Sequence, residues 1–132
     1  MAPAQLRCVV VDDDPEFLEQ VKRWFVTSCS DFEVMPFTNS VEAIDYLRLK
    51  RVDLVFTAYL VPQIDGLQLI SIVRSFNAHV PICMFSAVPI QATALARGAT
   101  AFFSKSAVWS QLGDALARIR GRISSHEVLT GG

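Results

Sequence analysis

The stretch Val9–Pro15 reads VVVDDDP and joins an apolar run directly to three adjacent carboxylates and a proline. A short, continuously apolar run is typical of a strand that is covered on both faces of a parallel sheet. Asp14 followed by Pro15 is typical of a helix N-cap with proline at the first helical position. The stretch therefore predicts a buried strand that passes into a helix, with Asp12 and Asp13 at the junction.

The same alternation recurs along the chain. The predicted strands are Leu6–Val11, Glu33–Phe37, Leu54–Ala58, Ile82–Phe85 and Ala101–Phe103. Segments with helical periodicity separate them, and five strand–helix repeats predict βαβ units with right-handed crossovers. We expect an α/β fold, a flavodoxin-like doubly wound sheet of five parallel strands with a helix after each.

Capping signals place the later helices. Asn39 followed by Glu42 resembles a capping box and predicts the start of the second helix. Gly66 opens the third helix. The fourth is short, from about Pro89 to Arg97, and Gly98 is typical of its C-terminal cap.

Composition bounds the class of protein. The chain has 132 residues, 52% of them hydrophobic, and a net charge of −1, which suits one globular domain and gives no electrostatic footprint for nucleic acid. We expect residues 1–123 to form this domain and residues 124–132 to be a flexible tail or linker stub. Three cysteines without metal-ligand spacing, no signal peptide after Met1 and no membrane-length apolar run predict a cytoplasmic protein that engages neither nucleic acid nor membrane.

Polar side chains gather where ligands bind to such sheets, at the carboxyl ends of the strands. Asp12 and Asp13 follow the first strand, and adjacent carboxylates there usually require a compensating cation. Oxygen ligands favour magnesium over zinc or copper. Ser86 ends the fourth strand and Lys105 follows the fifth, and a hydroxyl with an ammonium suits a phosphoryl oxygen.

Four separate motifs carry a family resemblance. Val9–Pro15, Val52–Thr57, Val61–Leu67 and Gly98–Lys105 occur in the order found in the receiver domains of two-component response regulators, which the chain resembles over residues 6–123. The resemblance implies that Asp12, Asp13 and the Leu60 carbonyl hold magnesium. It also implies that Ser86 and Lys105 contact the phosphoryl group, and that Phe102 is the aromatic switch residue.

Three departures from the family pattern bear on function. The position of the phosphate-accepting aspartate is occupied by Ala58, whose methyl group can neither attack phosphorus nor ligate a metal. Thr57 is adjacent, but neighbouring strand residues face opposite sides. Ser106 replaces the usual proline after Lys105, and the segment from Ser86 to Gly98 is about three positions short, which predicts a shortened fourth helix.

These departures set the expected ligand chemistry. Magnesium binding should be weak, because one of three carboxylates is missing. Without a strongly bound metal, Asp12 and Asp13 still need a positive neighbour, and Lys105 is expected within ion-pair range of one of them.

The leading hypothesis is a receiver-like signalling module that cannot accept phosphate at the usual position and is not an enzyme. Its expected partner is a protein (a histidine kinase, an output domain or another signalling protein), and we expect a monomer or weak homodimer. An apolar patch near Val88, Pro89, Ile90 and Trp109 would suit such a partner.

Two other hypotheses remain. One is an ordinary phosphorylatable receiver in which aspartate at position 58 has been changed to Ala58 by engineering. The other is a flavodoxin-like cofactor-binding enzyme, which the absence of a glycine-rich loop after the first strand disfavours.

Overall fold

The computed structural model describes residues 5–131, with side chains described as far as Ile123. Within this range five parallel strands form one sheet in the order β2-β1-β3-β4-β5. The strands are β1 (Leu6–Val11), β2 (Phe32–Phe37), β3 (Leu54–Ala58), β4 (Ile82–Ser86) and β5 (Ala101–Ser104). The predicted flavodoxin-like doubly wound fold is therefore confirmed, with each strand within one residue of its expected bounds.

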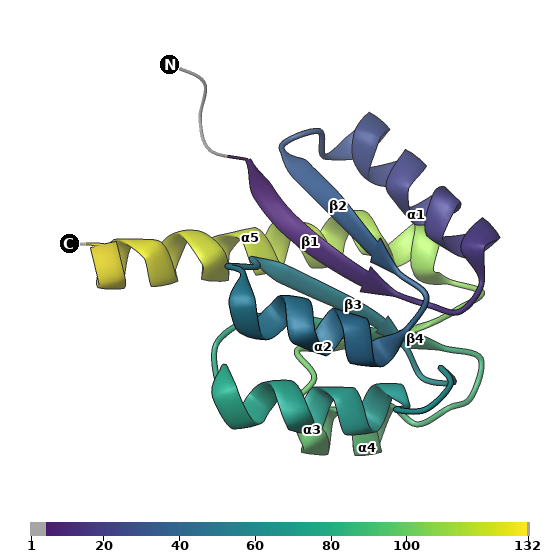
Figure 1. Ribbon diagram of the computed structural model, residues 1–132. Coiled ribbons are helices and arrows are strands. Elements are labelled where there is room, and N and C mark those ends of the chain that lie inside the picture. The colour runs from purple at the N-terminus through teal and green to yellow at the C-terminus, as the bar shows by residue number, and fades with distance from the viewer. Residues whose placement is uncertain (1–4, 132) are drawn as a thin grey trace.

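Five helices cover the two faces of this sheet. They are α1 (Pro15–Ser28), α2 (Ser40–Leu49), α3 (Gly66–Phe76), α4 (Gln91–Arg97) and α5 (Val108–Gly131). Helices α2, α3 and α4 lie on one face, and α1 and α5 lie on the other (Figure 1). None of the described helices is long and apolar enough to cross a membrane.

Local capping explains where the helices begin and end. The Asp14 carboxylate accepts a hydrogen bond from the Glu16 N–H at 3.0 Å, and Asn39 accepts from the N–H groups of Val41 and Glu42. Helix α4 has seven residues and ends at Gly98, whose φ of 115° is left-handed, as a glycine C-cap allows. The predicted short fourth helix is confirmed, although it begins at Gln91 rather than near Pro89.

The core lies on both sides of the central strands. Strands β3 and β4 are buried along their whole length, and the rings of Phe25, Phe56 and Phe85 are among the largest fully buried side chains. The continuous apolarity of these strands follows from their position, because helices cover both faces of a parallel sheet.

The chain ends bear on the predicted domain bounds. The backbone of α5 is helical to Gly131, whereas the sequence predicted a flexible tail from residue 124. The side chains of that segment lie outside the described residues, and so do residues 1–4. The flexibility of the tail and the start of the domain at residue 1 therefore stay predictions.

The strand order locates the functional edge. The chain runs from β1 outward to β2 and then returns to the other side of β1 to form β3, so the topological switch point lies between β1 and β3. Val11 pairs with Thr57 across this boundary. Asp12 and Ala58 therefore belong to the two strands that flank the switch point.

Gly66, the first residue of α3, provides a test of how tightly the β3–α3 connection is packed. A Cβ added there would clash with the backbone carbonyl oxygen of Ala58 and approach the end of the Met84 side chain. We expect Gly66→Ala to lower the free energy of unfolding by about 1–3 kcal/mol, the usual cost of overpacking.

The matched control is Gly113→Ala in α5, because a Cβ there meets no atom within 4 Å. This variant should leave the free energy of unfolding unchanged or raise it by up to about 1 kcal/mol, since alanine is the better helix former. Urea unfolding of both variants checks the pair, and equal stabilities would contradict the close approach.

Candidate functional site at the carboxyl edge of the sheet

A buried carboxylate stands directly after β1. Asp12 is only 1% exposed, and both of its oxygens have partners. Oδ1 accepts a hydrogen bond from the Asp14 N–H at 3.0 Å, and Oδ2 accepts one from the Lys105 ammonium at 3.0 Å. Burial raises the pKa of Asp12 above its ordinary value, and the bonds from Asp14 and Lys105 oppose that rise.

Lys105 is held in place by its backbone and by its side chain. Its N–H donates to the Ser86 carbonyl at 3.0 Å, which fixes the segment after β5 against the end of β4. Its ammonium lies 4.5 Å from the centre of the Phe17 ring and 5.8 Å from that of Phe85. The predicted ion pair with one of the two aspartates is thus confirmed, and it is reinforced by two cation–π contacts.

Asp12 and Asp13 are not equivalent. Asp13 is exposed, whereas Asp12 is buried and already paired with a cation. The described residues contain no group of three or more His, Cys, Asp or Glu side chains that could hold a metal ion. A magnesium ion would have to displace the Lys105 ammonium from Asp12, so these residues fit the ion poorly.

The end of β3 offers no nucleophile. Ala58 is 5% exposed, and the Leu60 side chain two residues later is 67% exposed. Thr57 is fully buried, and its hydroxyl donates to the Ala58 carbonyl at 2.9 Å. The Thr57 hydroxyl therefore acts as an internal donor to the backbone.

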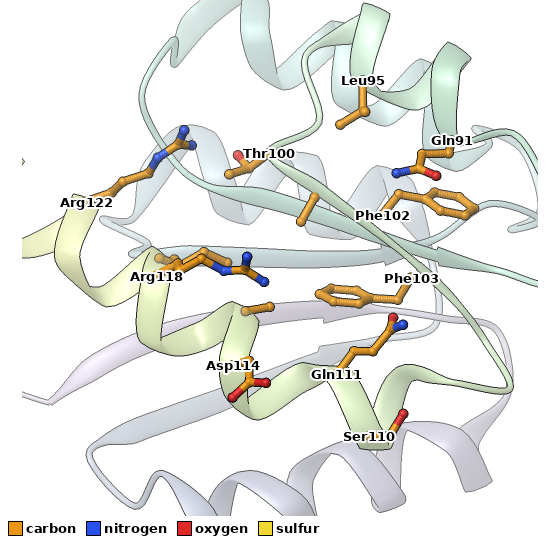
Figure 2. A pocket seen from close by; sticks show the side chains of 13 residues that line it. Gln91, Leu95, Thr100, Phe102, Phe103, Ser110, Gln111, Asp114, Arg118 and Arg122 are labelled. Atoms are coloured by element: carbon orange, nitrogen blue, oxygen red, sulfur yellow. The ribbon is translucent and has the colours of Figure 1, made fainter.

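Ser86 and Phe102 occupy different surroundings. Ser86 is 6% exposed, and its hydroxyl oxygen accepts a hydrogen bond from the Val88 N–H at 2.9 Å, at the same edge as Lys105. Phe102 is half-buried and points into the region between α4 and α5 beside Gln91 (Figure 2). The structure thus brings Asp12, Ser86 and Lys105 to one edge and leaves the Phe102 ring facing elsewhere.

Two neighbours of the Lys105 ammonium were not predicted from the sequence. In the sequence, the helical periodicity after Pro15 indicates only that Phe17 faces the core, and the apolar run that ends at Phe85 indicates only a strand. Both rings contact the Lys105 ammonium. Phe85 immediately precedes Ser86, a signal that could have placed its ring at this edge, but no pattern in the sequence connects Phe17 with Lys105. The backbone after Lys105 is trans, as Ser106 predicts, since the described residues contain no cis peptide bond.

Comparison with known proteins identifies the family to which the chain belongs. The model of the response regulator receiver domain family matches residues 8–117. The transcriptional regulatory protein PrrA of Mycobacterium tuberculosis is 31% identical, over 96% of this chain and 57% of its own length. The chain therefore spans about half the length of the curated relatives it matches.

Solved structures agree. The receiver domain of the response regulator NarL from M. tuberculosis is 28% identical and superposes with a TM-score of 0.77, over 90% of this chain and 99% of that domain. A two-component response regulator from Clostridium difficile, 20% identical, superposes with a TM-score of 0.82 over 90% of this chain and 98% of its own, and shows the fold. The fold, with Asp12, Ser86 and Lys105 together at its carboxyl edge, is that of a receiver module. The chain belongs to the response regulator receiver domain family of two-component systems.

The raised pKa of Asp12 has a consequence for stability. Burial favours the protonated carboxyl of Asp12 in the folded state, so its pKa there lies above the ordinary value of 3.8. Stability is therefore lost as the pH rises from the ordinary pKa through the raised pKa of the folded state. Relative to an Asp12→Asn variant, the wild-type protein should therefore lose stability on going from about pH 3.5 to pH 7.

Urea unfolding of both proteins at several pH values measures this difference, and the charges they share cancel in the comparison. A wild-type protein that gains stability relative to Asp12→Asn over the same range would contradict the prediction. It would show that the bond to Lys105 outweighs the cost of burying the carboxylate.

Proposed function

We propose that this receiver domain is a signalling module that does not accept phosphate at the usual position and that acts through contacts with another protein. The observation that carries the proposal is Ala58 at the end of β3, beside the switch point of the sheet. Phosphoryl transfer to this position requires an oxygen nucleophile, and a methyl group has none. The neighbouring hydroxyl, that of Thr57, is engaged with a backbone carbonyl.

The Asp12–Lys105 ion pair supports the same proposal. In this arrangement the ammonium compensates the buried carboxylate that a metal ion would otherwise neutralise. Receiver domains commonly bind magnesium at the phosphorylation site, and Asp12, Asp13 and the Leu60 carbonyl are the groups that would hold it here. We expect an affinity in the millimolar range or weaker, because magnesium must both lose waters and displace Lys105.

Exposed apolar side chains suit a protein partner. Val88 and Trp109 are 37% and 38% exposed, Pro89 is exposed, and Ile90 is partly buried against the core. The Trp109 ring also packs on Phe17, with ring centroids 5.6 Å apart, so Trp109 adjoins the site that holds Lys105. A histidine kinase, an output domain or another signalling protein is the proposed class of partner, and the module is proposed to be monomeric or weakly dimeric.

The proposed inability to accept a phosphoryl group is tested by intact-mass measurement after incubation with acetyl phosphate and magnesium. The wild-type chain should show no phosphoryl adduct. A stable single adduct mapped to the carboxyl edge of the sheet would refute the proposal.

The variant Ala58→Asp distinguishes a site that is altered at several positions from one that lacks only the carboxylate at position 58. The control is Ala58→Asn, which has the same shape but no nucleophilic oxygen. We expect Ala58→Asp to bind magnesium more tightly than wild type, measured by calorimetry, yet to take up phosphate slowly, because Lys105 is paired with Asp12 and the Lys105–Ser106 bond is trans. Uptake within minutes, absent in Ala58→Asn, would favour the engineered-receiver hypothesis.

A further inference from the structure

A cleft of about 650 Å³ lies between α4 and α5 and is floored by β5. We call it the α4–α5 cleft. Strand β5 stands at the edge of the sheet, so its outer side has no neighbouring strand. Helix α4 packs against β5 but has only seven residues. The volume lies within the range of about 300–1,000 Å³ that is usual for small-molecule sites.

Two arginines give the cleft a positive end. Arg118 and Arg122 line it from successive turns of α5, and both are exposed. Within the described part of the chain, neither guanidinium forms a hydrogen bond or an ion pair. Like charges four residues apart on a helix repel each other, and an anion bound between them would relieve that repulsion.

The one carboxylate in the cleft does not cancel this charge. Asp114 lies one turn before Arg118, and Figure 2 shows its carboxylate directed away from the Arg118 guanidinium. The charged side chains lining the cleft are therefore two cations and one anion, and both cations follow Asp114 along α5.

The rest of the lining offers apolar and hydrogen-bonding surface. Leu95 projects from α4 and is 43% exposed, and Phe102 projects from β5 beside the Gln91 amide (Figure 2). A flat apolar group can pack against the Phe102 ring and Leu95, while Gln91 supplies a donor and an acceptor.

We propose that the α4–α5 cleft binds a small anionic molecule with a flat apolar part. Its carboxylate, sulfonate or phosphate group pairs with Arg118 and Arg122, which suit planar bidentate recognition of such anions, and its apolar part packs on Phe102 and Leu95. Phe102 is three residues from Lys105 in the chain, so an occupant of the cleft contacts the strand that leads to the Asp12–Lys105 ion pair. The inference does not depend on whether position 58 accepts phosphate.

The test uses the full 132-residue chain and anilinonaphthalene sulfonate, which has the charge and shape proposed for the ligand. Fluorescence titration should show one saturable site per chain. The double variant Arg118→Gln/Arg122→Gln should bind at least about tenfold more weakly, because both charge-assisted contacts are lost. Arg118→Lys/Arg122→Lys, which keeps the charge, should recover part of that loss.

The matched control is Arg23→Gln. Arg23 is an exposed arginine that lines a separate, shallower groove with Trp24 and Trp109. This variant should bind within about twofold of wild type, and circular dichroism should show that every variant is folded. An unchanged affinity in the glutamine double variant, or an equal loss in Arg23→Gln, overturns the proposal. A cleft that binds no probe while the double glutamine variant abolishes dimers on gel filtration also overturns it, because the surface would then be an interface between chains.

Discussion

Burial of the Asp12 carboxylate is the constraint on which the rest of this site depends. A carboxylate that is 1% exposed is tolerated only when its charge is compensated and its oxygens accept hydrogen bonds. Lys105 and the Asp14 N–H provide both, at 3.0 Å each. The Lys105 ammonium is in turn restrained by the faces of Phe17 and Phe85, which limits where it can go.

The fold creates this constraint through strand order. Because β1 lies inside the sheet, the residue that follows it lies at a covered edge, where helices and loops exclude water. The β3–α3 connection closes the site from one side, since Gly66 approaches the Ala58 backbone so closely that no side chain fits. On the other side, the Lys105 N–H binds the Ser86 carbonyl and fixes the start of the β5–α5 connection. At the end of β3 this frame surrounds the methyl group of Ala58, the position where we propose that the phosphate-accepting carboxylate is missing.

The sequence predicted the fold well because its signals are local and repeated. Apolar runs of strand length, the Asp14-Pro15 cap and the glycines at positions 66 and 98 each determine their own element, and the structure places all of them as expected. The Asp12–Lys105 pair was also predicted, since parallel strands bring their carboxyl ends to one edge. The contacts of Lys105 with Phe17 and Phe85 were not, because they depend on how α1 packs against the ends of β4 and β5. The α4–α5 cleft escaped prediction for the same reason, although the short fourth helix that leaves it open was visible in the spacing from Ser86 to Gly98.

The central claim is that Lys105 serves as the internal cation of Asp12, and a double-mutant cycle for unfolding tests it most directly. The cycle compares wild type, Asp12→Asn, Lys105→Met and the double variant at pH 7, where methionine keeps much of the apolar stem of the lysine. We predict a coupling free energy of about 1–3 kcal/mol. It should largely persist in about 0.5 M salt, because salt screens a partly buried pair less than an exposed one. A coupling below about 0.3 kcal/mol, or one that salt abolishes, would contradict the account, because it would mean that Asp12 and Lys105 do not depend on each other.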